Sequence, residues 1–389
     1  METVPVTSPL EAGHKKQQAK AEQIKVKTNP NLSKGNPMTV RGIDHILFYV
    51  DNADQWARWH EDTMGMRRRA VGDPSTGLEG RKAIVVGQGR INFVFAEPAG
   101  NGPMRDEVQR HVETHGNGVK DLAFRVRDVD AAIAHAKKVG AKVLKEPTVT
   151  DGYHHAQIAA YSDTVHSLVM RDNHANFAPG FRAVPAGVED DVVELAMVDH
   201  VVANVNNMNE WVNFYAKIFG FDEVRHFDIN TGKSALMSKV VGDEDGYIKL
   251  PINEPSSENS QIAEFIREYK GEGVQHIALL TPDIITAVGA MRQRGMKFLN
   301  VPDTYYEEMP GRVGEIKEDL KKVQERRILV DRDRPDGYLL QLFAEPLFDR
   351  PTMFYEIIQR RGNSDGFGEG NFRALFEAIE REQEKRGSL

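Results

Sequence analysis

The chain has 389 residues, of which 40% are hydrophobic and 28% charged, and its formal net charge is −8. An acidic chain without a basic block argues against nucleic-acid binding, because such proteins neutralise phosphates with Lys and Arg. The absence of Cys excludes disulfides, zinc ribbons, iron–sulfur clusters and thiol catalysis. The longest apolar run, residues 46–50, is far shorter than the ~20 residues of a membrane span, and residues 1–30 lack the apolar core of a secretory signal. We therefore expect a soluble, cytoplasmic protein.

Residues 1–38 differ in composition from the rest of the chain. They are rich in Lys, Gln, Pro, Ser and Asn, and the first aromatic residue of the chain is Phe48. Such a segment cannot bury enough apolar surface to offset the entropy lost on ordering. We predict a flexible tail over 1–38, followed by a first domain over 39–180.

Two blocks of sequence occur twice in the chain. The string "GIDHILFYVDNADQWARWHEDTMGM" from Gly42 matches "MVDHVVANVNNMNEWVNFYAKIFGF" from Met197, and "GVKDLAFRVRDVDAAIAHAKKVGAKVLKEP" from Gly118 matches "GVQHIALLTPDIITAVGAMRQRGMKFLNVP" from Gly273. Identical residues lie 155 positions apart in both blocks. Chance matches would not keep one offset through two separated blocks, so we predict a duplicated domain whose second copy covers 196–389.

Each copy has the same order of predicted elements. A strand (43–50 or 198–205) leads to a helix that ends at Gly65 or Gly220, and further strands follow, such as 82–86 and 90–96 in the first copy. The second block predicts a strand (119–126 or 274–280), a helix capped by Asp128 or Asp283, and a strand that ends at Pro147 or Pro302. These elements form βαβββ modules, which indicate an α+β fold with curved mixed sheets.

The C-terminal sequence predicts an amphipathic helix over 371–385. In "NFRALFEAIEREQEKR", Asn371 is a candidate N-cap, and Phe372, Leu375, Phe376 and Ile379 fall on one helical face. A terminal amphipathic helix is most often part of the core. The Gly-rich string "NSDGFGEG" before it favours a lid instead.

A candidate metal site is confined to the second copy. His200 and His276 lie in matched strands, and Glu356 lies in the apolar run "MFYEII", where a carboxylate is costly to bury unless it is paired or bound to metal. The first copy has His45, which alone is more often a core residue, but it has Asp121 in the second position and no carboxylate in "VHSLVMRD". We expect the first copy to bind no metal. Two His and one carboxylate suit Fe²⁺, with Zn²⁺ as the competitor, although no HExxH motif is present.

Several strings of the second copy carry a family resemblance. They are "LPINEP" (250–255), "SQI" (260–262), "GVQHIAL" (273–279), "ILVDRD" (328–333), "YLLQLF" (338–343), "DRPTMFYEIIQR" (349–360) and "GFGEGNFRALFEAIE" (366–380). In these strings the chain resembles the 4-hydroxyphenylpyruvate dioxygenases of the vicinal-oxygen-chelate superfamily, from about residue 41 to the C-terminus. The resemblance implies two tandem vicinal-oxygen-chelate domains with open-barrel mixed sheets.

The resemblance also implies the site and the reaction. Fe²⁺ would be held by His200, His276 and Glu356, and the reaction would convert 4-hydroxyphenylpyruvate and O₂ to homogentisate and CO₂ in tyrosine and phenylalanine catabolism. The implied catalytic polar residues are Gln275, Gln341, Asn253 and Ser234. The implied substrate-binding residues are Gln261, Phe343, Phe354, Phe367 and Phe372. It further implies a homo-oligomer, either a dimer or a tetramer.

Other interpretations of these residues stay open at this point. The Gln residues at 275 and 341 could bond only to backbone, and the Phe residues at 343 and 354 could be simple core. Three rival functions remain: 4-hydroxymandelate synthase on the same substrate, an extradiol ring-cleaving dioxygenase, and a metal-free binding protein of the same fold. By analogy with the family, Phe372 favours ring hydroxylation, and no additional His base for ring cleavage is evident.

Overall fold

The computed structural model describes residues 37–172, 176–185, 192–230, 235–258, 260–372, 374, 380, 383–384 and 387. The chain divides into two compact units, Met1–Leu32 and Ser33–Leu389. The first unit lies outside the described residues. No helix in the described part of the chain is long and apolar enough to cross a membrane.

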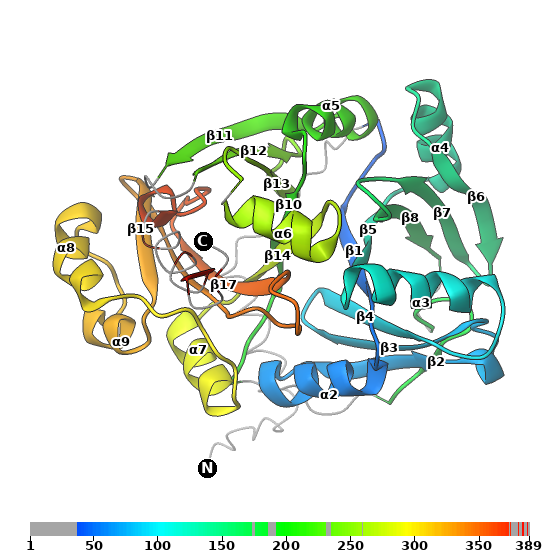
Figure 1. The fold of residues 1–389 in the computed structure, drawn as a ribbon, viewed down its shortest axis with the longest axis horizontal. Coiled ribbons are helices and arrows are strands. Elements are labelled where there is room, and N and C mark those ends of the chain that lie inside the picture. Colours follow the sequence, from blue (N-terminus) through cyan, green and yellow to red (C-terminus); the bar gives the residue numbers. More distant parts are fainter. Residues whose placement is uncertain are drawn as a thin grey trace, which may run out of the picture. The chain divides into compact units, whose positions relative to one another are not determined.

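The first half forms one mixed sheet, drawn in blue to green in Figure 1. The strands follow the order β6-β7-β8-β5-β1-β4-β3-β2-β9. Its elements are β1 (Gly42–Tyr49), α2 (Ala53–Met64), β2 (Arg67–Gly72), η1 (Pro74–Thr76), β3 (Arg81–Gln88), β4 (Ile91–Pro98), α3 (Pro103–His115), β5 (Gly118–Arg125), α4 (Val129–Lys138), β6 (Val143–Thr150), β7 (Tyr153–Ala159), β8 (Val165–Arg171) and β9 (Arg182–Ala183).

The second half repeats this arrangement, with the strand order β11-β12-β13-β10-β14-β17-β16-β15. Its elements are β10 (Met197–Asn204), α5 (Met208–Phe219), β11 (Asp222–Asn230), β12 (Ala235–Gly242), β13 (Lys249–Pro255), α6 (Gln261–Tyr269), β14 (Gly273–Leu280), α7 (Ile284–Gln293), α8 (Asp303–Val313), α9 (Leu320–Glu325), β15 (Leu329–Arg334), β16 (Gly337–Phe343), β17 (Phe354–Arg361) and η2 (Glu369–Asn371). The predicted α+β class and the repeated βαβββ order are confirmed.

The local signals in the sequence explain the first helix of each half. Asn52 and Asn207 accept from the backbone N–H three residues later and so begin α2 and α5. Gly65 and Gly220 end these helices at φ of 67° and 70°, where a side chain would be strained. Each helix covers the strands that follow it, so that both halves bury an equivalent apolar face.

One predicted strand differs between the halves. In the first half the strand runs through Pro147 as β6, but in the second half only Phe298 forms a bridge, to Ala344. The segment that carries α8 and α9 is inserted after Pro302, and the strand position is resumed by β15, which pairs with β16 as β6 pairs with β7. The prediction of a strand ending at Pro302 is therefore wrong. An insertion that has no counterpart in the first half cannot be inferred from the repeat.

Aromatic residues of both halves share one apolar cluster. A matched pair of contacts crosses between the halves: His60 Nε2 lies 2.8 Å from Tyr355 Oη, and His166 Nε2 lies 2.8 Å from Tyr215 Oη. Met38, which the sequence assigns to the tail, is also fully buried in this cluster. The two halves are therefore joined by a common core.

These buried histidines predict a loss of stability in acid. Burial lowers the pKa of His60 to about 3 and that of His166 to about 4. An unfolded His binds its proton near pH 6.5, so stability is fully present above that pH and is lost as pH falls toward the folded values. Each His should reduce the free energy of unfolding by about 1.4 kcal/mol per pH unit. We expect urea denaturation at pH 7, 6 and 5 to show this slope.

Variants can assign that slope to individual residues. His166→Gln should lower stability at pH 7 but flatten the dependence on pH by about 1.4 kcal/mol per unit. His226→Gln is the control, because that side chain is 59% exposed. A slope for His166→Gln equal to that of the unmodified protein would refute the assignment.

Candidate metal centre and substrate pocket

The second sheet brings the three predicted ligands together. Strands β10, β14 and β17 are neighbours, and His200 pairs with Ala278, which in turn pairs with Glu356. His276 lies two residues before Ala278 and so points to the same face of the sheet. A bulge between Val198 and His200 sets the direction of the His200 side chain.

The ligand atoms of these side chains converge. His200 Nε2 lies 3.1 Å and His276 Nε2 lies 3.5 Å from the same oxygen, Glu356 Oε2. The side chains are 4%, 12% and 3% exposed, in the order His200, His276 and Glu356. One candidate ligand atom from each residue lies within 4.8 Å of the others. This cluster is therefore compact enough for three residues to share one ion.

Outer hydrogen bonds determine which ring nitrogen is free. His200 Nδ1 lies 2.9 Å from Asp199 Oδ1, and His276 Nδ1 lies 2.9 Å from Gln275 Oε1. Both partners are acceptors, so each ring carries its proton on Nδ1 and keeps a lone pair on Nε2. Glu356 Oε1 is buried and has no hydrogen-bond partner among the described residues. An unpaired buried oxygen beside two inward lone pairs fits a metal ion.

Asp199 is itself held by a partly buried cation. Arg360 donates to it from Nε over 2.8 Å and from Nη2 over 2.7 Å, and it also donates to the carbonyl of Gly366. Burial raises the pKa of Asp199, but Arg360 and Lys249 outweigh burial and hold it well below its usual range. This pair was not predicted from the sequence. The matched Asp44 and Asp199 were a signal, because each precedes the His of its copy.

Burial and charge within the cluster shift the pKa values of all three candidate ligands. Burial raises the pKa of Glu356, but the two histidines outweigh burial and lower it overall. Burial lowers the pKa of His276, which therefore stays neutral near pH 7. Burial alone would lower the pKa of His200, but Glu356 and Asp199 outweigh burial and raise it, so metal binding at Nε2 competes with protonation of this ring.

Aromatic rings surround this cluster. Phe354 stacks on His276 with a centroid distance of 4.9 Å, Phe343 lies 6.2 Å from the same ring, and Phe367 lies 5.3 Å from His200. Phe372 meets Phe227 at 5.0 Å, and Phe227 in turn lies 6.2 Å from Phe367. Phe343, Phe354 and Phe367 thus lie beside the candidate ligands, and Phe372 is joined to them through Phe227. Phe227 of β11 also belongs to this series of rings, although the sequence did not mark it as a site residue.

The predicted polar residues occupy different surroundings. Both amide atoms of Gln341 are buried without a partner among the described residues. Asn253 donates to Asn204 Oδ1 over 3.1 Å. Gln261 lines a cavity of about 40 Å³ together with Gln275 and Phe354. Ser234 lies outside the described residues. Both polar atoms of the buried Gln341 amide are therefore left for a bound molecule.

The segment after β17 is tethered beside the cluster by the inserted helices. Asn371 Oδ1 accepts from Tyr305 Oη over 2.6 Å and from Arg312 Nη2 over 3.1 Å, and Gly370 N donates to Asp331 Oδ2 over 3.0 Å. Asn371, the predicted N-cap, is the last residue of the 3₁₀ turn η2, directly before Phe372, and its side chain faces α8. Leu375, Phe376 and Ile379 of the predicted helix lie outside the described residues.

Gly368 shows how closely this segment approaches the pocket. Its φ is +78°, and a Cβ there would collide with the side chain of Gln341. Only glycine therefore lets the backbone cover Gln341 in this way.

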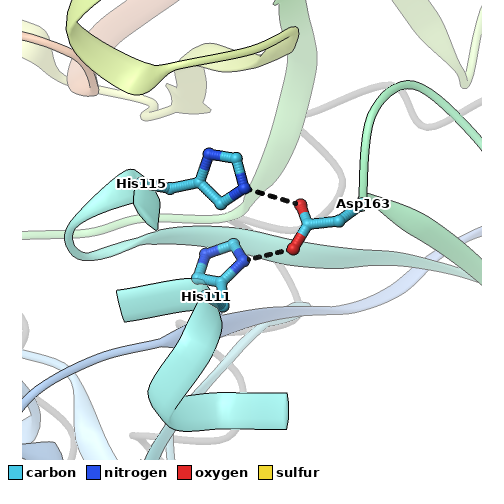
Figure 2. Close-up of side chains that lie close together, drawn as sticks. All are labelled: His111, His115 and Asp163. Carbon is cyan, nitrogen blue, oxygen red and sulfur yellow. Dashed lines mark hydrogen bonds and ion pairs between the residues drawn. The ribbon is translucent and has the colours of Figure 1, made fainter. Parts of the chain in front are cut away.

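A second cluster of similar composition lies at the contact between the halves. Figure 2 shows His111 and His115, both from α3, pointing at the two oxygens of Asp163, at 2.8 and 3.5 Å. Lys120 Nζ lies 3.4 Å from Asp163 Oδ2, so this carboxylate already faces a cation that would repel a metal ion. His115 Nδ1 lies 2.6 Å from the carbonyl of Tyr269 in the other half. The surroundings therefore indicate a structural network rather than a metal centre.

Known proteins share the sequence and the fold. The sequence model of the Glyoxalase/Bleomycin resistance protein/Dioxygenase superfamily matches residues 42–170 and 197–342. The 4-hydroxyphenylpyruvate dioxygenase of Neurospora crassa is 44% identical over 90% of this chain and 93% of its own, and that of Caenorhabditis elegans is 42% identical over 90% and 94%. A mutant 4-hydroxymandelate synthase from Streptomyces coelicolor superimposes with a TM-score of 0.80 at 30% identity, covering 89% of this chain and 100% of its own. The chain belongs to the 4-hydroxyphenylpyruvate dioxygenase family of this superfamily.

Proposed function

We propose that the chain is a non-haem iron dioxygenase that converts 4-hydroxyphenylpyruvate and O₂ to homogentisate and CO₂, with Fe²⁺ held by His200, His276 and Glu356. The observation that carries this proposal is the convergence of two Nε2 lone pairs on a buried carboxylate that keeps one oxygen unpaired. Two His and one carboxylate with open positions suit non-haem Fe²⁺. Bound iron supplies the redox chemistry that links use of O₂ to decarboxylation and hydroxylation.

The surrounding residues orient the substrate. The partner-free amide of Gln341 is available to an oxygen of the substrate, and an amide brings no acidic proton to the site. The rings of Phe343 and Phe354 lie beside His276, where they can hold an aromatic ring against the metal ligands. Fixing that ring determines which of its carbons reacts.

Residues 366–372 shield the candidate ligands from water. Phe367 packs on His200, and Phe372 continues the wall through Phe227. Closing the site protects reactive intermediates from side reactions. We propose that the predicted helix over 371–385 is the lid of this site. We further propose that metal binds in the domain over 196–389 and not in the domain over 39–180. The chain is also proposed to assemble as a dimer or a tetramer.

The experiment is to purify the protein without oxygen, measure its iron content, and then add 4-hydroxyphenylpyruvate and O₂. We expect one iron per chain and homogentisate as the product, with one O₂ consumed per homogentisate. The product 4-hydroxymandelate would establish the synthase instead, which matches the chain at the lower identity of 30%. Zinc in place of iron, or no product from iron-loaded protein, would contradict the proposal.

Two amide variants separate metal binding from substrate binding. Gln275→Leu removes the acceptor of His276 Nδ1–H and should weaken metal binding by about 10–100-fold. Gln341→Leu should leave metal affinity within about twofold, because Gln341 contacts no ligand atom, but should raise the substrate KM. Competition with a coloured chelator measures the first quantity, and initial rates measure the second. Equal metal affinities for the two variants would contradict these roles.

A further inference from the structure

The first half retains the framework of the metal centre without its ligands. His45 and Asp121 occupy the positions of His200 and His276 in the matched strands. Ser167 lies two residues after Val165, the partner of Asp121, as Glu356 lies two residues after Phe354, the partner of His276. The pair Asp44–Arg171 likewise repeats Asp199–Arg360, and His45 Nδ1 lies 2.8 Å from Asp44 Oδ1.

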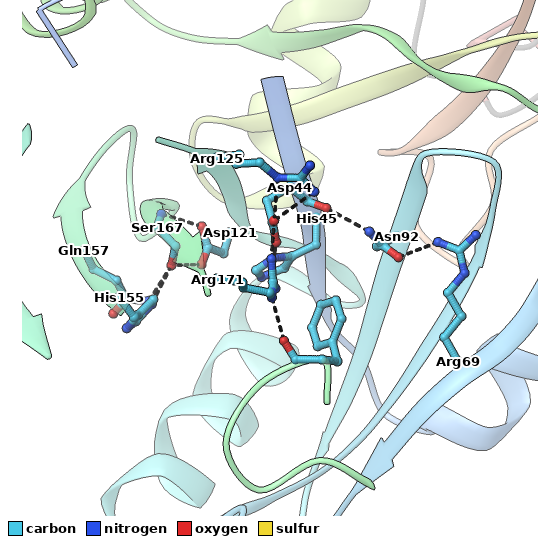
Figure 3. A network of polar contacts seen from close by, with 11 residues as sticks. Asp44, His45, Arg69, Asn92, Asp121, Arg125, His155, Gln157, Ser167 and Arg171 are labelled. Carbon is cyan, nitrogen blue, oxygen red and sulfur yellow. Dashed lines mark hydrogen bonds and ion pairs between the residues drawn. The ribbon is translucent and has the colours of Figure 1, made fainter. Parts of the chain in front are cut away.

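The former ligand positions are bonded to one another in this half. Figure 3 shows Ser167 against both oxygens of Asp121: its backbone N–H donates over 2.9 Å and its hydroxyl donates to the second oxygen. His155 Nε2 and Gln157 Nε2 lie 3.0 and 3.1 Å from the same hydroxyl oxygen. Asp121 is therefore engaged, and the floor of this site is a closed network of hydrogen bonds.

Above this floor lies a cavity of about 210 Å³, which we call the first-half cavity. Its lining includes Arg81, Lys145, Tyr153, Phe177 and Phe181, in addition to the floor residues. An engineered cavity of about 150 Å³ holds benzene in another protein. The first-half cavity is thus large enough for one aromatic ring with a short side chain.

The charges at the wall favour an anion. Neither Arg81 nor Lys145 forms an ion pair with a carboxylate among the described residues; the Arg81 side chain contacts the hydroxyl of Tyr49 and the sulfur of Met104, the latter at 3.8 Å. The nearby carboxylates are already engaged, since Asp44 faces Arg171 and Arg125, and Asp121 faces Ser167. Burial and the adjacent Lys145 lower the pKa of His155 to about 3, so His155 is a neutral part of the wall.

The remaining wall suits an aromatic ring. Phe177 packs edge-on against Phe181 at 5.4 Å and against His45 at 5.3 Å, and Arg171 lies over the rings of Tyr153 and Phe177. These contacts already hold the wall side chains in place, so binding a ligand would cost little of their conformational entropy. We propose that the first-half cavity is a metal-free binding site for a small aromatic carboxylate, whose carboxylate is held by Arg81 and Lys145.

Calorimetric titration of the full, iron-loaded chain with 4-hydroxyphenylacetate tests this proposal. The probe has a ring and a carboxylate but lacks the 2-oxo group expected to direct a ligand to the second half. We expect saturable binding that Arg81→Gln and Lys145→Gln each weaken about tenfold, as for loss of a charged hydrogen bond. Lys142→Gln is the matched control, because Lys142 lies near the same exposed edge and does not line the cavity; it should change affinity less than twofold.

Further outcomes show which half binds the probe and which chemical group of the probe is recognised. Neutral 4-hydroxybenzyl alcohol should bind at least tenfold more weakly than the acid. Absence of saturable binding would overturn the proposal. Binding that resists both cation variants but is lost in Gln275→Leu would also overturn it, because the probe would then be bound in the second half. Inorganic phosphate binding as tightly as the probe would overturn the aromatic assignment. Lys145 is exposed, so its variant keeps the test valid even if Arg81→Gln lowers the melting temperature.

Discussion

Glu356→Ala should remove metal and turnover together. The carboxylate is the point on which both histidines converge, and without it His200 and His276 offer two neutral nitrogens and no charge to balance a dication. Metal content should fall from one ion per chain to near zero, and homogentisate formation should fall by about 10³-fold or more, equivalent to a metal contribution of about 4 kcal/mol. Elemental analysis and product assay on the same samples measure both quantities.

The repeat in the chain supplies the matched control for this variant. Ser167→Ala alters the equivalent position of the first half and should leave metal content and turnover unchanged. Stability could confuse the result, because Glu356 is buried, so the melting temperature of Glu356→Ala without metal must be compared with that of the metal-free unmodified protein. An iron-loaded, active Glu356→Ala would contradict the assignment, and metal loss in Ser167→Ala would place an ion in the wrong half.

Most of the fold could be predicted because the duplication doubles each local signal. Asn52 with Asn207 and Gly65 with Gly220 mark the same helix ends twice, and the structure has helices with those ends. The insertion of α8 and α9 could not be found in this way, since it has no counterpart to align with. Its residues join the C-terminal segment through side-chain hydrogen bonds between Asn371, Tyr305 and Arg312, which no periodicity encodes.

The grouping of His200, His276 and Glu356 could be predicted for a similar reason. A His occurs in both copies, at His45 and His200, but the carboxylate of Glu356 occurs in the second copy alone. This difference favours a metal site in the second copy over a pair of core histidines. The outer pair of Asp199 and Arg360 escaped prediction, although it is repeated as Asp44 and Arg171, because an ion pair between distant strands depends on their register. Comparing copies for charged pairs, and not only for identical residues, would have located both pairs.

Removing residues 371–389 should separate chemistry from enclosure. All three candidate ligands and the bonds from Arg360 to Asp199 and Gly366 remain in the shortened chain, so we expect metal content to stay within about twofold. Phe372 is lost from the ring series that leads through Phe227 to Phe367, which opens the wall to water. Turnover should fall about 100-fold, as for a misplaced substrate, and less homogentisate should form per O₂ consumed.

A gentler change tests the same lid without shortening the chain. Asn371→Ala removes the acceptor for Tyr305 and Arg312 and should reduce the yield of homogentisate per O₂. Asn363→Ala should not, because within the described part of the chain the Asn363 side chain bonds to Asp336 alone. Iron content, melting temperature and oxygen uptake on each variant separate the possible roles. If the segment were only structural, shortening the chain would lower melting temperature and iron content together. Full coupling of O₂ to homogentisate in a stable shortened chain would refute the lid, because the wall would then be closed without Phe372.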